Sequence, residues 1–213
     1  MLGPKRLVAV CGTGTDIGKT WVGAAMLTHL TKTGAVVAAR KPVQSFHPDG
    51  ARHTDAHSLA AATGESPSQV CPPHRWYEMA LAPPMAAEAL GRPPFTVVEL
   101  MAELDWPAHC DVGLVETAGG VRSPIAADGD VAAFVRLLAP DVTLLVAEAG
   151  LGTINSVRLS LEALDSSRCV VLLNRFDRSI DLHRRNLQWL VERDRLTVLT
   201  DPVAAAERLL ALS

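Results

Sequence analysis

Short apolar runs alternate along this chain with longer stretches in which apolar residues recur every three or four positions. The short runs predict buried strands, and the longer spacing is typical of helices that bury one face. The expected strands are residues 7–10, 35–40, 111–116, 141–147, 168–173 and 196–200. The expected helices are residues 21–32, 55–62, 85–90, 96–104, 131–138, 156–164, 181–193 and 203–212.

Strands and helices therefore alternate throughout the chain. This order predicts a doubly wound α/β fold, in which helices flank a mostly parallel sheet. At 213 residues the chain suits one core, so we expect residues 1–213 to form a single domain.

The segment 65–95 interrupts the alternation. It contains seven prolines, and proline breaks helices and the interior of sheets. We expect a long irregular excursion there, with the short helix near 85–90 as its regular part. Insertions of this kind at a ligand-binding edge often shape a substrate pocket.

The first predicted strand leads into Gly12-Thr13-Gly14-Thr15-Asp16-Ile17-Gly18-Lys19-Thr20, and helical spacing follows. This order predicts a phosphate loop, because backbone N–H groups and the helix dipole attract an anion, the lysine reaches the terminal phosphates and the threonine takes Mg²⁺. The glycine spacing is unusual, but the strand-to-helix context disfavours a turn that binds nothing. We therefore expect a P-loop NTPase-type ATP-binding domain, with nucleotide contacts from Gly14, Thr15, Asp16, Ile17, Gly18, Lys19, Thr20 and Trp21.

Polar residues follow two further predicted strands. Lys41 and Ser45 come after the second strand, and Glu116 ends the third. In an open parallel sheet, ligands bind beyond the carboxyl ends of the strands, so these side chains are expected on the same edge as the phosphate loop. Glu116 resembles the carboxylate of a Walker B strand, and we favour Mg²⁺ binding over a plain surface acid.

Asp55 follows Thr54, a residue suited to cap a helix. Asp55 is either a second metal ligand or an acid favoured by the helix dipole, and the pattern alone leaves both open. His47, His53 and His57 lie nearby, with the last two at a helical spacing of four. Because no cysteine is close and the region is polar, we expect solvated histidines rather than a metal site.

The composition of the chain limits the kinds of partner that we expect the protein to bind. A formal net charge of −3 leaves no basic excess for nucleic acid. Four cysteines are widely spaced, and Cys11 and Cys169 fall in predicted strands, so we expect reduced, buried thiols. The first apolar run is too short for a signal peptide, and no run reaches the length of a membrane span. We expect a cytoplasmic protein that binds neither nucleic acid nor a membrane.

Taken together, the motifs resemble those of the dethiobiotin synthetase family. The phosphate loop is similar in its wider glycine spacing, Lys41-Pro42-Val43-Gln44-Ser45 resembles the family's Lys-Pro-Val motif, and Thr54-Asp55-Ala56 resembles its metal-binding segment. Glu116-Thr117-Ala118-Gly119-Gly120 is similar to Glu-Gly-Ala-Gly-Gly, residues 151–155 match a Leu-Gly-x-Ile-Asn turn, and Asn174 falls at an adenine-contacting asparagine.

The resemblance implies that 7,8-diaminononanoate takes up CO₂ as a carbamate, that ATP phosphorylates the carbamate, and that the second amine closes a ureido ring. The implied catalytic residues are Lys41, Lys19 and Thr15. The implied ligands of Mg²⁺ are Thr20, Asp55 and Glu116. The implied substrate contacts, the last of them across a homodimer boundary, are Lys41, Ser45, Gly119, Leu151 and Asn155. Further nucleotide contacts are expected from Asp55, Glu116, Gly119, Asn174 and Arg175.

Some positions depart from the family pattern. Thr117 stands where the family has glycine, and Arg122 and Ser123 stand where it is usually apolar. Residues 201–203 do not clearly match its nucleotide-base loop. A relative with a changed amine substrate therefore remains an alternative.

Two other protein classes share part of the pattern. The dimeric partition and iron-protein ATPases are nucleotide switches with a further lysine five residues before the phosphate-loop lysine, and here that position is Gly14. This difference, together with Lys41, favours the ligase. An amide-forming synthetase of cobyrinic acid type would need a further domain with a nucleophilic cysteine, for which we expect this chain to be too short.

Overall fold

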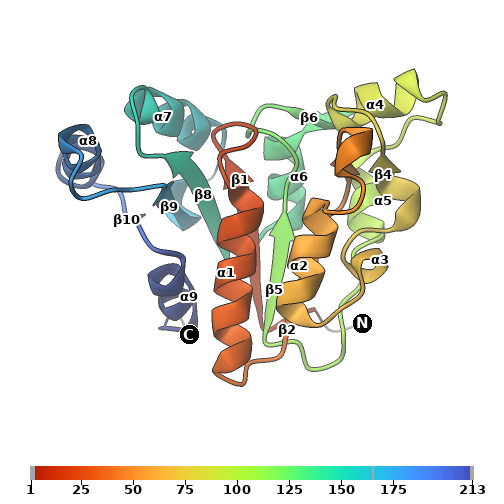
Figure 1. The fold of residues 1–213 in the computed structure, drawn as a ribbon, viewed down its shortest axis with the longest axis horizontal. Coiled ribbons are helices and arrows are strands. Elements are labelled where there is room, and N and C mark those ends of the chain that lie inside the picture. Colours follow the sequence, from red (N-terminus) through yellow and green to blue (C-terminus); the bar gives the residue numbers. More distant parts are fainter. Residues whose placement is uncertain (1–2, 165, 212–213) are drawn as a thin grey trace.

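The structure is a computed structural model that describes residues 3–164 and 166–211. The strands of its main sheet are β1 (Arg6–Gly12), β2 (Val37–Arg40), β5 (Val112–Glu116), β8 (Val142–Glu148), β9 (Cys169–Asn174) and β10 (Val198–Leu199). Within the described residues these six strands are all parallel and lie in the order β10-β9-β8-β1-β5-β2 (Figure 1). The predicted α/β fold with a parallel sheet is confirmed.

Helices cover both faces of the sheet (Figure 1). They are α1 (Lys19–Lys32), α2 (Asp55–Thr63), α3 (Pro67–Val70), α4 (Pro83–Ala89), α5 (Val97–Ala102), α6 (Val131–Leu138), α7 (Thr153–Ala163), α8 (Asp181–Glu192) and α9 (Pro202–Ala211). Because side chains alternate along a strand, Val8 and Val10 enter the core beneath α1, α2 and α9, whereas Ala9 and Cys11 enter the core beneath α6 and α7. β1 therefore has buried side chains on both of its faces.

The segment 65–95 has more regular structure than the sequence predicted. Besides α3 and α4, it contains a 3₁₀ turn at Pro73–Arg75 and the strand β4 (Trp76–Tyr77), which pairs in parallel with β3 (Gln44–Ser45). The prolines fit because several occupy the first helical positions, where an N–H would have no intrahelical acceptor. The short helix predicted at 85–90 is confirmed as α4, whereas the expectation that this helix is the regular part of the segment was wrong for this reason.

Stacked contacts between arginines and aromatic rings hold this segment together. The guanidinium of Arg92 lies 4.3 Å from the ring centroid of Tyr77, which stacks on Phe95 at 5.7 Å. The guanidinium of Arg75 lies 4.6 Å from the ring centroid of Phe95 and pairs with Glu103 at 2.6 Å. Both rings are buried, so the contacts combine apolar burial with cation–π attraction.

Several element boundaries differ from the predictions. The second strand begins at Val37 rather than residue 35, and the last spans Val198–Leu199 rather than residues 196–200. α7 begins at Thr153, so Asn155 lies within the helix instead of the preceding turn. The end of the helix predicted at 203–212 lies outside the described residues. A short antiparallel pair, β6 (Pro124–Ala126) with β7 (Gly129–Asp130), was not predicted.

The thiols mostly occupy the predicted environments. Cys11, Cys71 and Cys110 are buried, whereas Cys169 is half-buried, which corrects the expectation of four buried thiols. Burial raises the pKa of Cys11 to about 12 and that of Cys71 to about 12. None of the described helices has both the length and the apolar character needed to cross a membrane.

Candidate active site

The phosphate loop, residues 13–18, connects β1 to α1. Asp16 and Gly18 have left-handed backbone conformations, with φ of 58° and 91°. Within the described part of the chain, no backbone N–H from Gly14 to Gly18 donates to a backbone carbonyl. Lys19 Nζ donates to the Gly14 carbonyl at 2.9 Å. Unpaired N–H donors, a helix N-terminus and an ammonium group together form a site for an anion such as phosphate.

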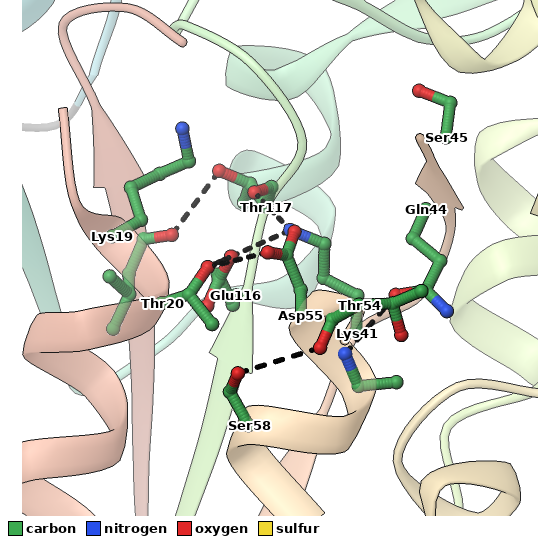
Figure 2. Close-up of polar contacts among 12 residues, drawn as sticks. Lys19, Thr20, Lys41, Gln44, Ser45, Thr54, Asp55, Ser58, Glu116 and Thr117 are labelled. Atoms are coloured by element: carbon green, nitrogen blue, oxygen red, sulfur yellow. Dashed lines mark hydrogen bonds and ion pairs between the residues drawn. The ribbon is translucent and has the colours of Figure 1, made fainter. Parts of the chain in front are cut away.

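Four side chains from four parts of the fold meet beside this loop, and we call them the Lys41 cluster: Thr20, Lys41, Asp55 and Glu116 (Figure 2). Lys41 Nζ lies 2.6 Å from Glu116 Oε1 and 2.7 Å from Asp55 Oδ2. The Thr20 hydroxyl lies 2.8 Å from Asp55 Oδ1 and 2.9 Å from Glu116 Oε1. The residues of the Lys41 cluster therefore lie together at the edge of the sheet, as the sequence predicted.

Burial and pairing set the charges in the Lys41 cluster. Burial raises the pKa of Glu116, and the charge of Lys41 only partly offsets that rise. Lys41 lowers the pKa of Asp55. Burial disfavours the charge of Lys41 itself, but Asp55 and Glu116 outweigh burial and raise the pKa of Lys41. For Lys19, burial and then the charge of Lys41 lower the pKa.

The oxygens of the Lys41 cluster suit a hard cation. Glu116 Oε2 is buried and has no hydrogen-bond partner among the residues the structure describes. Two further oxygen groups lie beside it, the hydroxyl of Thr20 and the carboxylate of Asp55. These two groups are within hydrogen-bond distance of each other. Oxygen ligands of this kind are those that Mg²⁺ prefers. The residues present therefore fit the Mg²⁺ that the resemblance implies.

The cluster and the phosphate loop line a cavity of about 1120 Å³. The loop and the start of α1 form one side, and β3 together with residues 80–83 forms another. Ser45 lies apart from the Lys41 cluster, on the β3 side (Figure 2). Its hydroxyl donates to the Leu81 carbonyl at 2.6 Å. Other predicted site residues that line the cavity are Thr15, Asp16, Trp21, Gly119 and Arg175.

Two predicted substrate residues do not line this cavity. Leu151 is 91% exposed in the turn before α7, and Asn155 is exposed in the first turn of α7. Within one copy of the chain, the structure does not bring them to the Lys41 cluster. For Asn155, a role at the boundary with a second copy, as the resemblance implies, stays a prediction, and so does the expected substrate contact of Leu151.

Asn174 and Arg175 contact the phosphate loop itself. Asn174 Nδ2 donates to the Ile17 carbonyl at 2.8 Å, and Arg175 Nη2 donates to the Asp16 carbonyl at 3.1 Å. A Cβ on Gly18 would lie 2.2 Å from Asn174 Nδ2, so this approach requires glycine there. The expected contact of Asn174 with adenine stays a prediction.

Thr117 is accommodated without strain. Its φ lies outside the left-handed region, and its hydroxyl and its N–H both donate to the Val10 carbonyl, at 3.2 and 3.0 Å. Its own carbonyl accepts from Lys41 Nζ at 3.2 Å. The threonine therefore ties the end of β5 to β1 and does not need the conformational freedom of glycine.

Gln44 is a site residue that the sequence analysis did not single out. The side chain is buried, lines the cavity and accepts a hydrogen bond from the N–H of Ala56 at 3.1 Å, one residue after Asp55. The sequence did indicate a place for Gln44 in the site, because Gln44 follows Lys41 by three residues in the same segment.

Solved structures support the fold. A plasmid partition protein from Borrelia burgdorferi has a TM-score of 0.58 at 12% identity, with 99% of this chain and 98% of that one covered. The signal recognition particle receptor FtsY from Elizabethkingia anophelis has a TM-score of 0.55 at 14% identity, over 93% of this chain and 57% of that one. At such identities these likenesses show the P-loop NTPase fold alone.

Sequence comparisons are more specific. Residues 6–199 match the family model described as an AAA domain. The ATP-dependent dethiobiotin synthetase of Haloferax mediterranei is 36% identical over 91% of this chain and 82% of its own length. That of Anaeromyxobacter dehalogenans is 34% identical over 97% and 95%. That of Caulobacter sp. is 38% identical over 81% and 76%. With the phosphate loop, the Lys41 cluster and these relatives in agreement, the chain belongs to the dethiobiotin synthetase family.

Proposed function

We propose that this protein is an ATP-dependent dethiobiotin synthetase. It forms the ureido ring of dethiobiotin from 7,8-diaminononanoate and CO₂ through a phosphorylated carbamate, and it releases ADP and phosphate. The observation that carries this proposal is the position of Lys41 Nζ, which lies between Asp55 and Glu116 at the same sheet edge as the phosphate loop. Family membership supports the choice of substrate.

The reaction brings two anions together, a carbamate and the γ-phosphate of ATP. Their mutual repulsion is strong in a site shielded from water, so fixed positive charge is required between them. Lys19 lies at the phosphate loop, and Lys41 lies beside it on the substrate side. In the proposal Lys19 holds the terminal phosphates and Lys41 holds the carbamate oxygen that attacks phosphorus.

Thr20, Asp55 and Glu116 would hold Mg²⁺. When bound, Mg²⁺ supplies positive charge to the phosphate oxygens. Lys41 shares both carboxylates with this ligand set, so the same two residues orient the cation site and the carbamate-binding ammonium.

Further cavity residues have proposed supporting roles. The Thr15 hydroxyl donates to the phosphate in transfer, and the backbone N–H of Gly119 contacts substrate or nucleotide. Ser45 contacts the carbamate after its hydroxyl leaves the Leu81 carbonyl. Trp21 lines the cavity beside Thr20 and covers the phosphates.

The protein is proposed to act as a homodimer. Exposed Leu151 and Asn155 would then bind the substrate carboxylate of the neighbouring copy, near the N-terminus of α7. The single-domain organisation and the cytoplasmic location expected from the sequence also stay predictions.

The experiment that tests this function is ADP release measured with each substrate omitted in turn. The ligase requires both diaminononanoate and bicarbonate for stoichiometric ADP release. An ATPase switch would hydrolyse ATP without either, and a relative with a changed substrate would respond to another diamine. ADP release that is independent of bicarbonate would contradict the proposal.

A further inference from the structure

Arg175 reaches the phosphate loop from a distant strand. It directly follows β9, and Glu148, the last residue of β8, lies opposite Asn174 in the register of these two strands. β8 lies between β9 and β1 in the sheet. The guanidinium of Arg175 forms an ion pair with Glu148 and also donates to the carbonyl of Asp16, in the loop after β1. The arginine therefore spans the carboxyl ends of three neighbouring strands.

Because of the geometry of the peptide bond, this contact fixes the direction of the next N–H group in the phosphate loop. In a trans peptide the C=O of one residue and the N–H of the next point in opposite directions, and the described residues contain no cis peptide. The Asp16 carbonyl faces Arg175, so the N–H of Ile17 faces the other way. The Ile17 carbonyl faces Asn174, so the N–H of Gly18 also faces away.

Backbone N–H groups without a protein acceptor are the kind of donor that binds phosphate. Among the residues that the structure describes, neither the Ile17 nor the Gly18 N–H donates to a backbone carbonyl. Asp16 also has a left-handed φ of 58°, a backbone conformation that residues with a Cβ adopt infrequently. A hydrogen bond to its carbonyl stabilises this conformation.

We propose that Arg175, oriented by Glu148, is a positioning residue for the nucleotide: it holds the Asp16–Ile17 peptide so that the Ile17 N–H faces the bound phosphates. This inference rests on the proposed function only in taking ATP as the ligand. The competing explanation is direct attraction, because Arg175 lines the cavity and its side chain is 62% exposed.

The two explanations predict opposite effects of Glu148. If Arg175 acts on the loop, Glu148→Gln removes the group that orients the guanidinium and weakens nucleotide binding. If Arg175 attracts phosphate directly, the same change frees its charge from a competing carboxylate and tightens binding. Arg175→Met weakens binding under both explanations, and Arg175→Lys keeps the charge but cannot bridge Glu148 and Asp16 with two nitrogens of one planar group.

The test is the Kd of a non-hydrolysable ATP analogue with Mg²⁺, measured by calorimetry for the full chain. We expect Arg175→Met, Arg175→Lys and Glu148→Gln each to raise Kd by about 3- to 10-fold, which is the loss of one hydrogen bond. In turnover the KM for ATP rises in the same proportion while kcat stays within about twofold, because the chemistry at Lys41 is untouched.

Matched controls come from a second exposed ion pair, Arg185 with Asp181 on α8. Arg185→Met and Asp181→Asn should leave Kd unchanged, and unchanged thermal unfolding of all variants shows that they fold. A Glu148→Gln protein that binds the analogue as tightly as wild type, or more tightly, overturns the inference. Because the assay needs no diamine, a protein that binds ATP in this way but makes no dethiobiotin would overturn the proposed function instead.

Discussion

Lys41 Nζ lies 2.6 Å from Glu116 Oε1, and the two side chains are only 3% and 0% exposed. An unpaired charge at such a depth would be costly, and each group favours the charged form of the other. The same ammonium also lies at the cavity that the phosphate loop borders. Lys41 therefore has two separable roles, one in folding and one in binding an anionic substrate.

Replacing Lys41 with methionine tests both roles. Turnover should fall at least about 100-fold, because the carbamate loses its cation. The free energy of unfolding should fall by about 3 kcal/mol, because Glu116 remains buried without its partner. ADP release and chemical denaturation measure the two effects.

The double variant Lys41→Met, Glu116→Gln separates the two effects. It removes the unpaired buried carboxylate, so most of the lost stability should return while turnover stays low. Wild-type turnover in either variant would show that Lys41 has no part in catalysis.

Asp55→Asn and Glu116→Gln test the proposed cation site. Each change removes a negative charge from the ligand set, so the Mg²⁺ concentration for half-maximal turnover should rise about tenfold or more. Asp49→Asn is a matched control, because the Asp49 side chain is 93% exposed on the segment that leads to α2. The assignment fails if the two cluster variants keep the Mg²⁺ dependence of the control.

Gly113→Ala tests the packing of β5. A Cβ at this position would lie 2.5 Å from the Trp106 ring and 2.7 Å from Pro4 Cγ, so the ring has to move. We expect a loss of about 1–3 kcal/mol in the free energy of unfolding. Gly150→Ala is the control, since no heavy atom outside its chain neighbours lies within 4 Å of the new Cβ. Equal stability of the two variants would contradict the close packing of Trp106 and Pro4 on Gly113.

Thiol reactivity should follow burial. With the pKa of Cys11 and of Cys71 each raised to about 12, neither forms appreciable thiolate at pH 8, and both should react slowly with a thiol reagent. Cys169 is half-buried and should react first. Mass analysis of partly labelled protein checks this order, and Cys169→Ser should remove the first phase. Early modification of Cys11 would show that its strand opens readily.

The sequence predicted the sheet and the Lys41 cluster because both follow from local patterns. Apolar runs give strands, and parallel strands place the residues after their carboxyl ends at one edge, as seen for Lys41 and Glu116. The contact between Arg175 and Asp16 could not be predicted in this way. It depends on the left-handed conformations of both residues and on a reach across β8, which no spacing in the sequence encodes.

Local sequence patterns also could not predict the structure of the segment 65–95. Its proline content predicted irregular chain, but the stacking of Arg92 on Tyr77 and of Arg75 on Phe95 is a tertiary contact. The exposed Asn155 shows a different limit. Its predicted role depends on a second copy of the chain, and the fold of one copy neither requires nor prevents that role.

Following carbon from bicarbonate into the product tests the proposed ligase reaction most directly. Wild-type protein is incubated with 7,8-diaminononanoate, Mg-ATP and ¹³C-bicarbonate, and the products are measured by mass spectrometry. We expect dethiobiotin that carries one ¹³C atom, formed in equal amount with ADP and absent in the Lys41→Met protein. ADP formation without labelled dethiobiotin would contradict the proposed ligase reaction.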